Sequence, residues 1–104
     1  MNPETIEKMI ADGRDSAEAR LAVGQARLKA GEHELAAEHL EMAVVLRPDY
    51  TAAWQALGTV HRETGRDDAA REAWQNGLEA ARRAGDKQAE KVMGVFLARL
   101  DKEG

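Results

Sequence analysis

Apolar residues recur with helical spacing along the chain. In residues 3–12, Ile6, Met9 and Ile10 share one face at i, i+3 and i+4. A second stripe follows in residues 86–101, made by Ala89, Val92, Met93, Phe96 and Leu100. Runs of Val, Ile and Thr at alternate positions are missing, so no strand is predicted. The pattern predicts an all-α chain of about six helices.

Several residues mark where these helices begin and end. Asn2 and Pro3 are typical of a helix start, and Gly13 is typical of the end of the same helix. Ser16 is the expected N-cap of a helix that starts at Ala17. Later in the chain, the second helix of residues 51–84 is expected to run to Ala84 and to close at Gly85.

The two central segments repeat one another weakly. When the sequence is shifted by 34 residues, Gly24 meets Gly58 and Gly31 meets Gly65. Three further matches are Ala22 with Ala56, Ala36 with Ala70, and Glu38 with Glu72. The first pair of glycines allows antiparallel helices to approach closely, and the second pair suits the left-handed turn that ends a helix.

The spacing of larger residues resembles the tetratricopeptide repeat. In residues 51–84 the resemblance rests on Trp54, Leu57, Gly58, Ala70 and Trp74, with His61 in place of the usual Tyr. In residues 17–50 it rests on Val23, Gly24, Ala36, Leu40, Ala43 and Pro48. Two departures stand out: Arg20 and Arg27 occupy positions where Trp and Tyr are usual.

The resemblance implies a right-handed α–α superhelix of helical hairpins in a single domain, residues 1–104. Residues 17–50 would form the first repeat, and residues 51–84 the second. Residues 3–12 would be half of a repeat at the N-terminal end, and residues 86–101 a capping helix at the C-terminal end. Because solenoids normally need about three repeats, both flanking helices are expected to cover the open ends of the core.

The resemblance also implies a function, binding a peptide or a partner protein on the concave side, where the first helix of each repeat lies. The inward positions expected in the first repeat are Glu18, Leu21, Gln25, Leu28 and Lys29. Those expected in the second repeat are Ala52, Gln55, Thr59, Arg62 and Glu63. Members of the family that clamp chaperone tails use Lys and Asn there. Leu21, Gln25 and Ala56 stand at the first three clamp positions, so that activity is not expected.

Composition narrows the class of partner. The net charge is −4, and residues 1–50 carry all of it. A mildly acidic chain is repelled by phosphate backbones, so no nucleic-acid partner is expected. The chain has no cysteine, no apolar run of signal-peptide length and no membrane-spanning stretch. We therefore expect a cytoplasmic protein that does not bind membranes.

No residue constellation in the sequence predicts catalysis, a metal or a cofactor. His33 and His39 are six residues apart, which rotates the second ring about 240° from the first on a helix, so they cannot share a metal. His33 is expected at the surface, His39 in solvent and His61 at a packing position. Trp54 and Trp74 are likewise interpreted as packing residues. The chain is thus predicted not to be an enzyme.

A different class of function stays open at this point. The last helix carries Val95 and Leu97 beside its main stripe, so its apolar arc is wider than one interface needs. Such a surface is typical of a homodimer contact. The alternative hypothesis is therefore a self-associating structural scaffold that uses the C-terminal helix.

Overall fold

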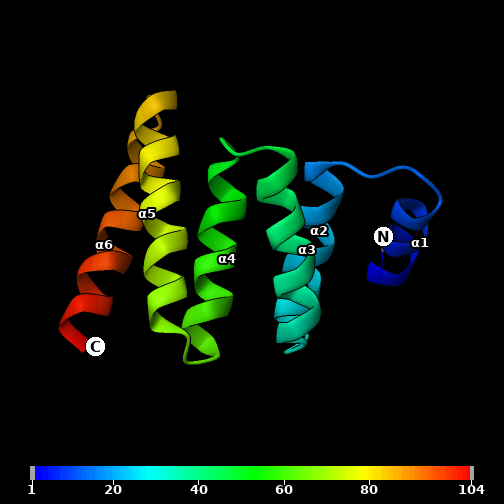
Figure 1. Ribbon diagram of the computed structural model, residues 1–104, viewed down its shortest axis with the longest axis horizontal. Helices are drawn as coiled ribbons and strands as arrows, with labels where there is room; N and C mark the ends of the chain where they lie inside the picture. Colours follow the sequence, from blue (N-terminus) through cyan, green and yellow to red (C-terminus); the bar gives the residue numbers. More distant parts are fainter. Residues whose placement is uncertain (1, 104) are drawn as a thin grey trace.

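The computed structural model describes residues 2–103, and within that range all regular structure is helical (Figure 1). The helices are α1 (Pro3–Ala11), α2 (Ala17–Lys29), α3 (His33–Leu46), α4 (Thr51–Glu63), α5 (Asp67–Ala84) and α6 (Lys87–Glu103). The all-α prediction is confirmed. The last helix begins one residue later and ends two residues later than the predicted range, and the first ends one residue earlier.

The helices follow one another along the long axis of the molecule (Figure 1). α2 pairs with α3 and α4 pairs with α5, each pair antiparallel across a short turn. α6 packs against α5 at one end, and α1 packs against α2 at the other. The overall dimensions are 42 × 29 × 19 Å, so each helix pair contacts mainly its neighbours, as in a solenoid.

The predicted helix ends are present. The Asn2 side chain accepts a hydrogen bond from the Thr5 backbone N–H at 2.8 Å, and Ser16 Oγ accepts one from Ala19 at 3.0 Å. Both bonds satisfy backbone donors that a helix start leaves free. Gly31 and Gly65 adopt φ values of 80° and 77°, the left-handed conformation that a side chain would strain.

The core consists of two clusters. The first lies among α2, α3, α4 and the facing side of α5, with Leu40 and Val60 completely buried. The second joins α5 to α6 through Trp74, Met93 and Leu100. Phe96 packs against Trp74 with ring centroids 5.1 Å apart. Trp74 is therefore a core residue, whereas Trp54 is partly buried and donates from Nε1 to the Pro48 carbonyl at 2.7 Å.

His61 is buried on α4, as expected for a packing residue. Its Nδ1 has no hydrogen-bond partner in the described chain. Burial, helped by the nearby Arg66 cation, lowers the pKa of His61 from its ordinary value of 6.5. The unfolded chain therefore binds this proton first. The stability that the neutral ring contributes is full above pH 6.5 and is lost as the pH falls below that value.

We expect the urea midpoint of unfolding to fall between about pH 7.5 and about pH 5, and to fall less in His61→Phe. The substitution removes the buried titrating nitrogen and leaves every other titratable group in place. Urea titrations of both proteins at both pH values, followed by circular dichroism, measure the difference. An equal fall in the two proteins would show that protonation of His61 does not oppose folding.

Candidate functional site

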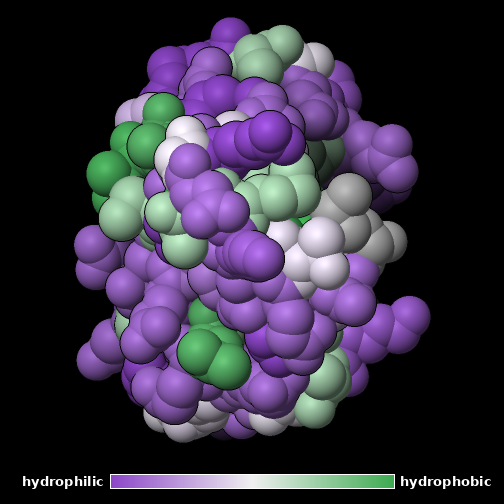
Figure 2. All heavy atoms as spheres, turned by 90° about the vertical axis from the view of Figure 1, so that its right-hand side faces the viewer, coloured by the Kyte–Doolittle hydropathy of each residue, from purple (hydrophilic) through white to green (hydrophobic). Residues whose placement is uncertain are grey.

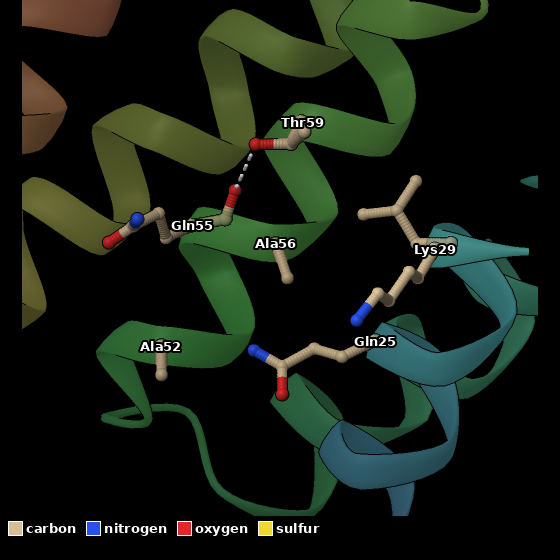
Figure 3. A pocket seen from close by; sticks show the side chains of 7 residues that line it. Gln25, Lys29, Ala52, Gln55, Ala56 and Thr59 are labelled. Atoms are coloured by element: carbon tan, nitrogen blue, oxygen red, sulfur yellow. Dashed lines mark hydrogen bonds between the residues drawn. The ribbon is translucent and has the colours of Figure 1, made fainter.

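A hollow of about 370 Å³ lies between α2 and α4. It is lined by Gln25, Leu28, Lys29, Ala52, Gln55, Ala56 and Thr59. Figure 3 shows Gln25 and Lys29 reaching from α2 toward Ala52 and Ala56 of α4. The two alanines and Leu28 supply the apolar part of the lining, and the longer side chains supply the polar part.

A second hollow of about 310 Å³ continues from α4 to α6. Its lining comprises Thr51, Ala52, Gln55, Asp86, Gln88, Ala89 and Val92. Because Ala52 and Gln55 line both hollows, the two form one continuous depression, here named the α2–α4–α6 groove. No α1 residue lines it, so the chain's own N-terminal helix does not fill the groove.

Three glutamine amides, one from each of these helices, line the groove. Among residues 2–103, the side chains of Gln25, Gln55 and Gln88 form no hydrogen bond with the protein. The Thr59 hydroxyl is engaged, since it donates to the Gln55 backbone carbonyl at 3.1 Å (Figure 3). An amide can both donate and accept, so the three glutamines offer both halves of a backbone hydrogen bond to a ligand.

The charges in the groove are placed at its two ends. Lys29 lies at the α2 end and forms no ion pair within the described residues. Asp86 lies at the α6 end, where its side chain accepts a hydrogen bond from the Ala89 backbone N–H at 3.0 Å. A ligand that crosses the groove therefore meets a cation on one side and a carboxylate on the other.

Comparison with known proteins identifies the fold. A family model described as tetratricopeptide repeat matches residues 4–51 and 21–89. The chain belongs to the tetratricopeptide repeat family. It is 48% identical over 99 residues to TPR repeat-containing protein PA0015 of Pseudomonas aeruginosa, an alignment that covers 95% of this chain and 94% of that protein.

Two further proteins are similar to this chain. The solution structure of protein BPP2914 from Bordetella parapertussis superposes with a TM-score of 0.82 at 37% identity, covering 97% of this chain and 88% of the other. The heat-shock protein cognate co-chaperone sgt12 of Aspergillus fumigatus is 42% identical over 50 residues, which is 48% of this chain and 15% of that protein.

The tetratricopeptide repeat geometry groups only part of the expected inward set. Gln25, Leu28, Lys29, Ala52, Gln55 and Thr59 line the groove together. Leu21 does not: it is 8% exposed and belongs to the first core cluster. Its prediction as a groove residue is therefore corrected, because its side chain is covered by the neighbouring helices.

Three charged residues of the expected set also lie outside the groove lining, each beside a side chain from another part of the chain. Glu18 pairs with Arg47. Arg62 pairs with Asp67 at 3.2 Å and also with Glu103. Glu63 lies 3.6 Å from His33. These side chains connect successive helices. Such contacts cannot be predicted from the faces of single helices.

Sequence reasoning missed the contribution of α6. Gln88, Ala89 and Val92 were expected only as part of a capping helix, yet they form one wall of the groove. The available signal was the repeat register, in which Gln88 follows Gln55 after 33 residues rather than 34. Because of that one-residue shift, an alignment of the repeats at a spacing of 34 residues does not match Gln88 with Gln55.

Two other expectations are corrected by side-chain positions. His39 is not in solvent: its side chain is 12% exposed and lies between Arg20 and Glu7. Leu97 does not widen an exposed apolar arc, since it is partly buried against the second core cluster. On α6, Val95 is the large apolar residue that stays exposed, at 42%. No helix in residues 2–103 has the length and apolar character needed to cross a membrane.

Proposed function

We propose that this protein is a non-catalytic interaction module that binds an extended segment of a partner protein in the α2–α4–α6 groove. Proteins of the tetratricopeptide repeat family are generally interaction modules without catalysis, and this chain shares their fold. The observation that carries the proposal is the set of three unpaired glutamine amides, one from each helix, in a groove that is otherwise partly apolar. Amides of this kind suit the main chain of a peptide, whose N–H and C=O groups all need partners.

The size of the groove sets the length of the bound segment. Neighbouring packed helices are about 8–10 Å apart, so three helices in a row span roughly 16–20 Å. An extended chain advances about 3.3 Å per residue, so about six residues cross the groove. A helix is about 10 Å wide with its side chains, which fits the shallow hollows between these helices less well than an extended segment does.

The charges at the two ends of the groove favour one orientation of the bound segment and a preference for certain residues along it. Lys29 favours a carboxylate on the segment, either an acidic side chain or a free C-terminus, at the α2 end. Asp86 favours a positive or neutral group at the α6 end. The middle of the groove carries no charge, so uncharged residues are expected there, since a buried charge without a partner is costly.

The co-chaperone relative supports a protein partner but not its identity. The word co-chaperone describes sgt12, and the match covers about half of this chain. Of the first three clamp positions, Leu21 is buried in the core, whereas Gln25 and Ala56 line the groove without a charge. We therefore propose a partner other than a chaperone tail held by the family's charged clamp.

The proposal is tested by selecting binders from a phage-displayed random peptide library. We expect peptides with one acidic residue or a free C-terminal carboxylate, and about tenfold weaker binding to Lys29→Glu. The expected loss follows from placing a carboxylate opposite the carboxylate of the peptide. Lys102→Glu is the matched control, because it makes the same charge change on an exposed residue outside the groove lining.

Binding constants for one selected peptide, measured by fluorescence anisotropy on all three proteins, decide the result. Equal losses in Lys29→Glu and Lys102→Glu would attribute binding to net charge and would overturn the groove assignment. A selection that returns only helical or strongly basic peptides would also contradict it.

Self-association through α6 is not proposed. That hypothesis needs both Val95 and Leu97 at the surface, and Leu97 is packed against the second core cluster. One exposed valine is a normal feature of a monomeric protein surface.

A further inference from the structure

Arg20 and Arg27, which replace the usual Trp and Tyr of the first repeat, lie with His39 at the N-terminal end of the molecule, where Arg27 and His39 contact the same carboxylate. Arg20 and Arg27 come from α2, and His39 comes from α3. Arg20 lies 3.2 Å from His39 Nδ1, and Arg27 is only 8% exposed. These three side chains are here named the basic cluster. The cluster lies outside the groove, since none of its members lines either hollow.

Among the carboxylates around the basic cluster, that of Glu7 on α1 contacts two of its members, Arg27 and His39. Arg27 donates to both Glu7 oxygens, at 2.5 and 3.2 Å. His39 Nε2 lies 2.8 Å from the same carboxylate. These hydrogen bonds, that of Arg27 first, lower the pKa of Glu7 despite its partial burial. Two-point contact with a guanidinium is specific for a planar anion such as a carboxylate.

The geometry also defines the proton on His39. A guanidinium has only donors, so Arg20 must donate to His39 Nδ1. A neutral His39 then carries its proton on Nε2 and donates it to Glu7. Three donors, two from Arg27 and one from His39, therefore converge on one acidic group. This arrangement surrounds a carboxylate presented by a helix with hydrogen-bond donors from α2 and α3.

The helix that supplies Glu7 is weakly anchored by apolar contact. α1 has nine residues and none of them is buried, whereas α6 buries Met93 and Leu100 almost completely. Ile6, Met9 and Ile10 are only partly covered. Seen from the α1 end, the surface is mainly hydrophilic with small separate apolar patches (Figure 2). Helices this short are marginal without tertiary support.

The basic cluster keeps partners when α1 is absent. Arg27 also bonds Glu32 at 3.0 Å, and Arg20 bonds Asp15 at 2.8 Å. Both acidic residues lie outside α1. Removal of Glu7 therefore does not leave either arginine without a counter-charge, which is the situation that makes loss of a buried partner severe.

We propose that the surface of α2 and α3 beneath α1 is a second interaction site, which binds a short amphipathic helix of a partner protein. The partner helix would carry a carboxylate in the place of Glu7 and apolar residues in the places of Ile6, Met9 and Ile10. α1 is the displaceable occupant of this site. The occupant's own chemistry, one acidic residue beside an i, i+3, i+4 apolar stripe, defines the class of partner. This site is independent of the groove and of its proposed ligand.

The test uses the full chain carrying Glu7→Ala and a fluorescent synthetic peptide of residues 2–14 with Glu7 intact. The substitution weakens the binding of the chain's own α1 to the site. In the wild-type chain α1 competes at high effective concentration, so the peptide is expected to bind the variant about tenfold more tightly than the wild-type chain. A second peptide with Glu7→Gln is expected to bind the variant about tenfold more weakly than the first. Anisotropy titrations give all of these values.

Several outcomes would overturn the proposal. Equal binding of the two peptides would show that the basic cluster does not recognise the Glu7 carboxylate of the peptide. Equal binding to wild-type and variant chains would place the peptide elsewhere. An unfolded Glu7→Ala chain, detected by circular dichroism, would make α1 part of the folding unit rather than a displaceable helix. A wild-type dimer that is lost in Glu7→Ala would assign the site to a second copy of this chain instead of a partner protein.

Discussion

Removal of residues 86–104 is expected to abolish cooperative folding. α6 contributes Met93 and Leu100, which are 0% and 1% exposed, to the second core cluster. Without them, Trp74 and the outer face of α5 lose their apolar cover. Deleting one buried large side chain costs about 2–5 kcal/mol, and an entire domain is stable by only about 5–15 kcal/mol. Losing two such residues together with the rest of the helix exceeds what the remaining chain can supply.

A single substitution tests the same interface more gently. Leu100→Ala should lower the free energy of unfolding by about 2–5 kcal/mol, whereas Val95→Ala on the exposed side of α6 should change it by less than about 0.5 kcal/mol. Phe96→Ala should cost less than Leu100→Ala because Phe96 is only partly buried.

Urea unfolding followed by circular dichroism measures all three variants and the truncated chain. A truncated chain that keeps a full helical signal and a cooperative transition would show that α1 to α5 form a complete folding unit. That result would remove the capping role assigned to α6.

Gly58→Ala is expected to destabilise the protein by about 1–3 kcal/mol or more, although alanine is the better helix former. An added Cβ at Gly58 would lie 2.2 Å from Nε1 and 2.3 Å from Cδ1 of Trp74. Trp74 cannot move away easily, because it is 4% exposed and its Nε1 donates to the Gln55 carbonyl at 3.1 Å. The helices α4 and α5 would have to separate.

The matched control is Gly94→Ala on α6. No other helix of the described chain lies within 4 Å of the Cβ that this substitution would add, and Gly94 lies inside a helix. The only remaining effect is helix propensity, so Gly94→Ala should stabilise the protein by about 0.5–1 kcal/mol. The close approach at Gly58 is confirmed if the urea or thermal midpoint falls in Gly58→Ala and rises in Gly94→Ala, each relative to the wild-type protein. A stabilised Gly58→Ala protein would mean that α4 and α5 leave room for a methyl group at this position.

The helices and their pairing could be predicted from the sequence because their signals are local or regularly spaced. Apolar stripes, the Asn2 and Ser16 caps and the glycines at helix ends act within a few residues. Gly24 and Gly58 indicate close helix approaches, and the side chains they face, Leu40 and Trp74, both follow 16 residues later. Such signals can be recognised without knowing how the neighbouring repeat packs.

The groove could be predicted only in part. Gln25, Lys29 and Gln55 project from the expected helix faces. By contrast, whether Leu21 enters the groove or the core depends on how closely the neighbouring helices cover it, and that distance is not encoded in the periodicity of α2. The same holds for Gln88, which reaches the groove only because α6 packs beside α4 with a one-residue change of register.

The all-helical repeat architecture and the helix ends follow from the order of residues, because near-neighbour sterics, capping and amphipathic spacing decide them. The contacts of the basic cluster, by contrast, could be found only in the folded chain. Arg27 and Glu7 are 20 residues apart, and His39 and Glu7 are 32 apart, so no local pattern pairs them. Their contact exists because packing α1 against α2 brings the Glu7 carboxylate within hydrogen-bond distance of Arg27 on α2 and His39 on α3.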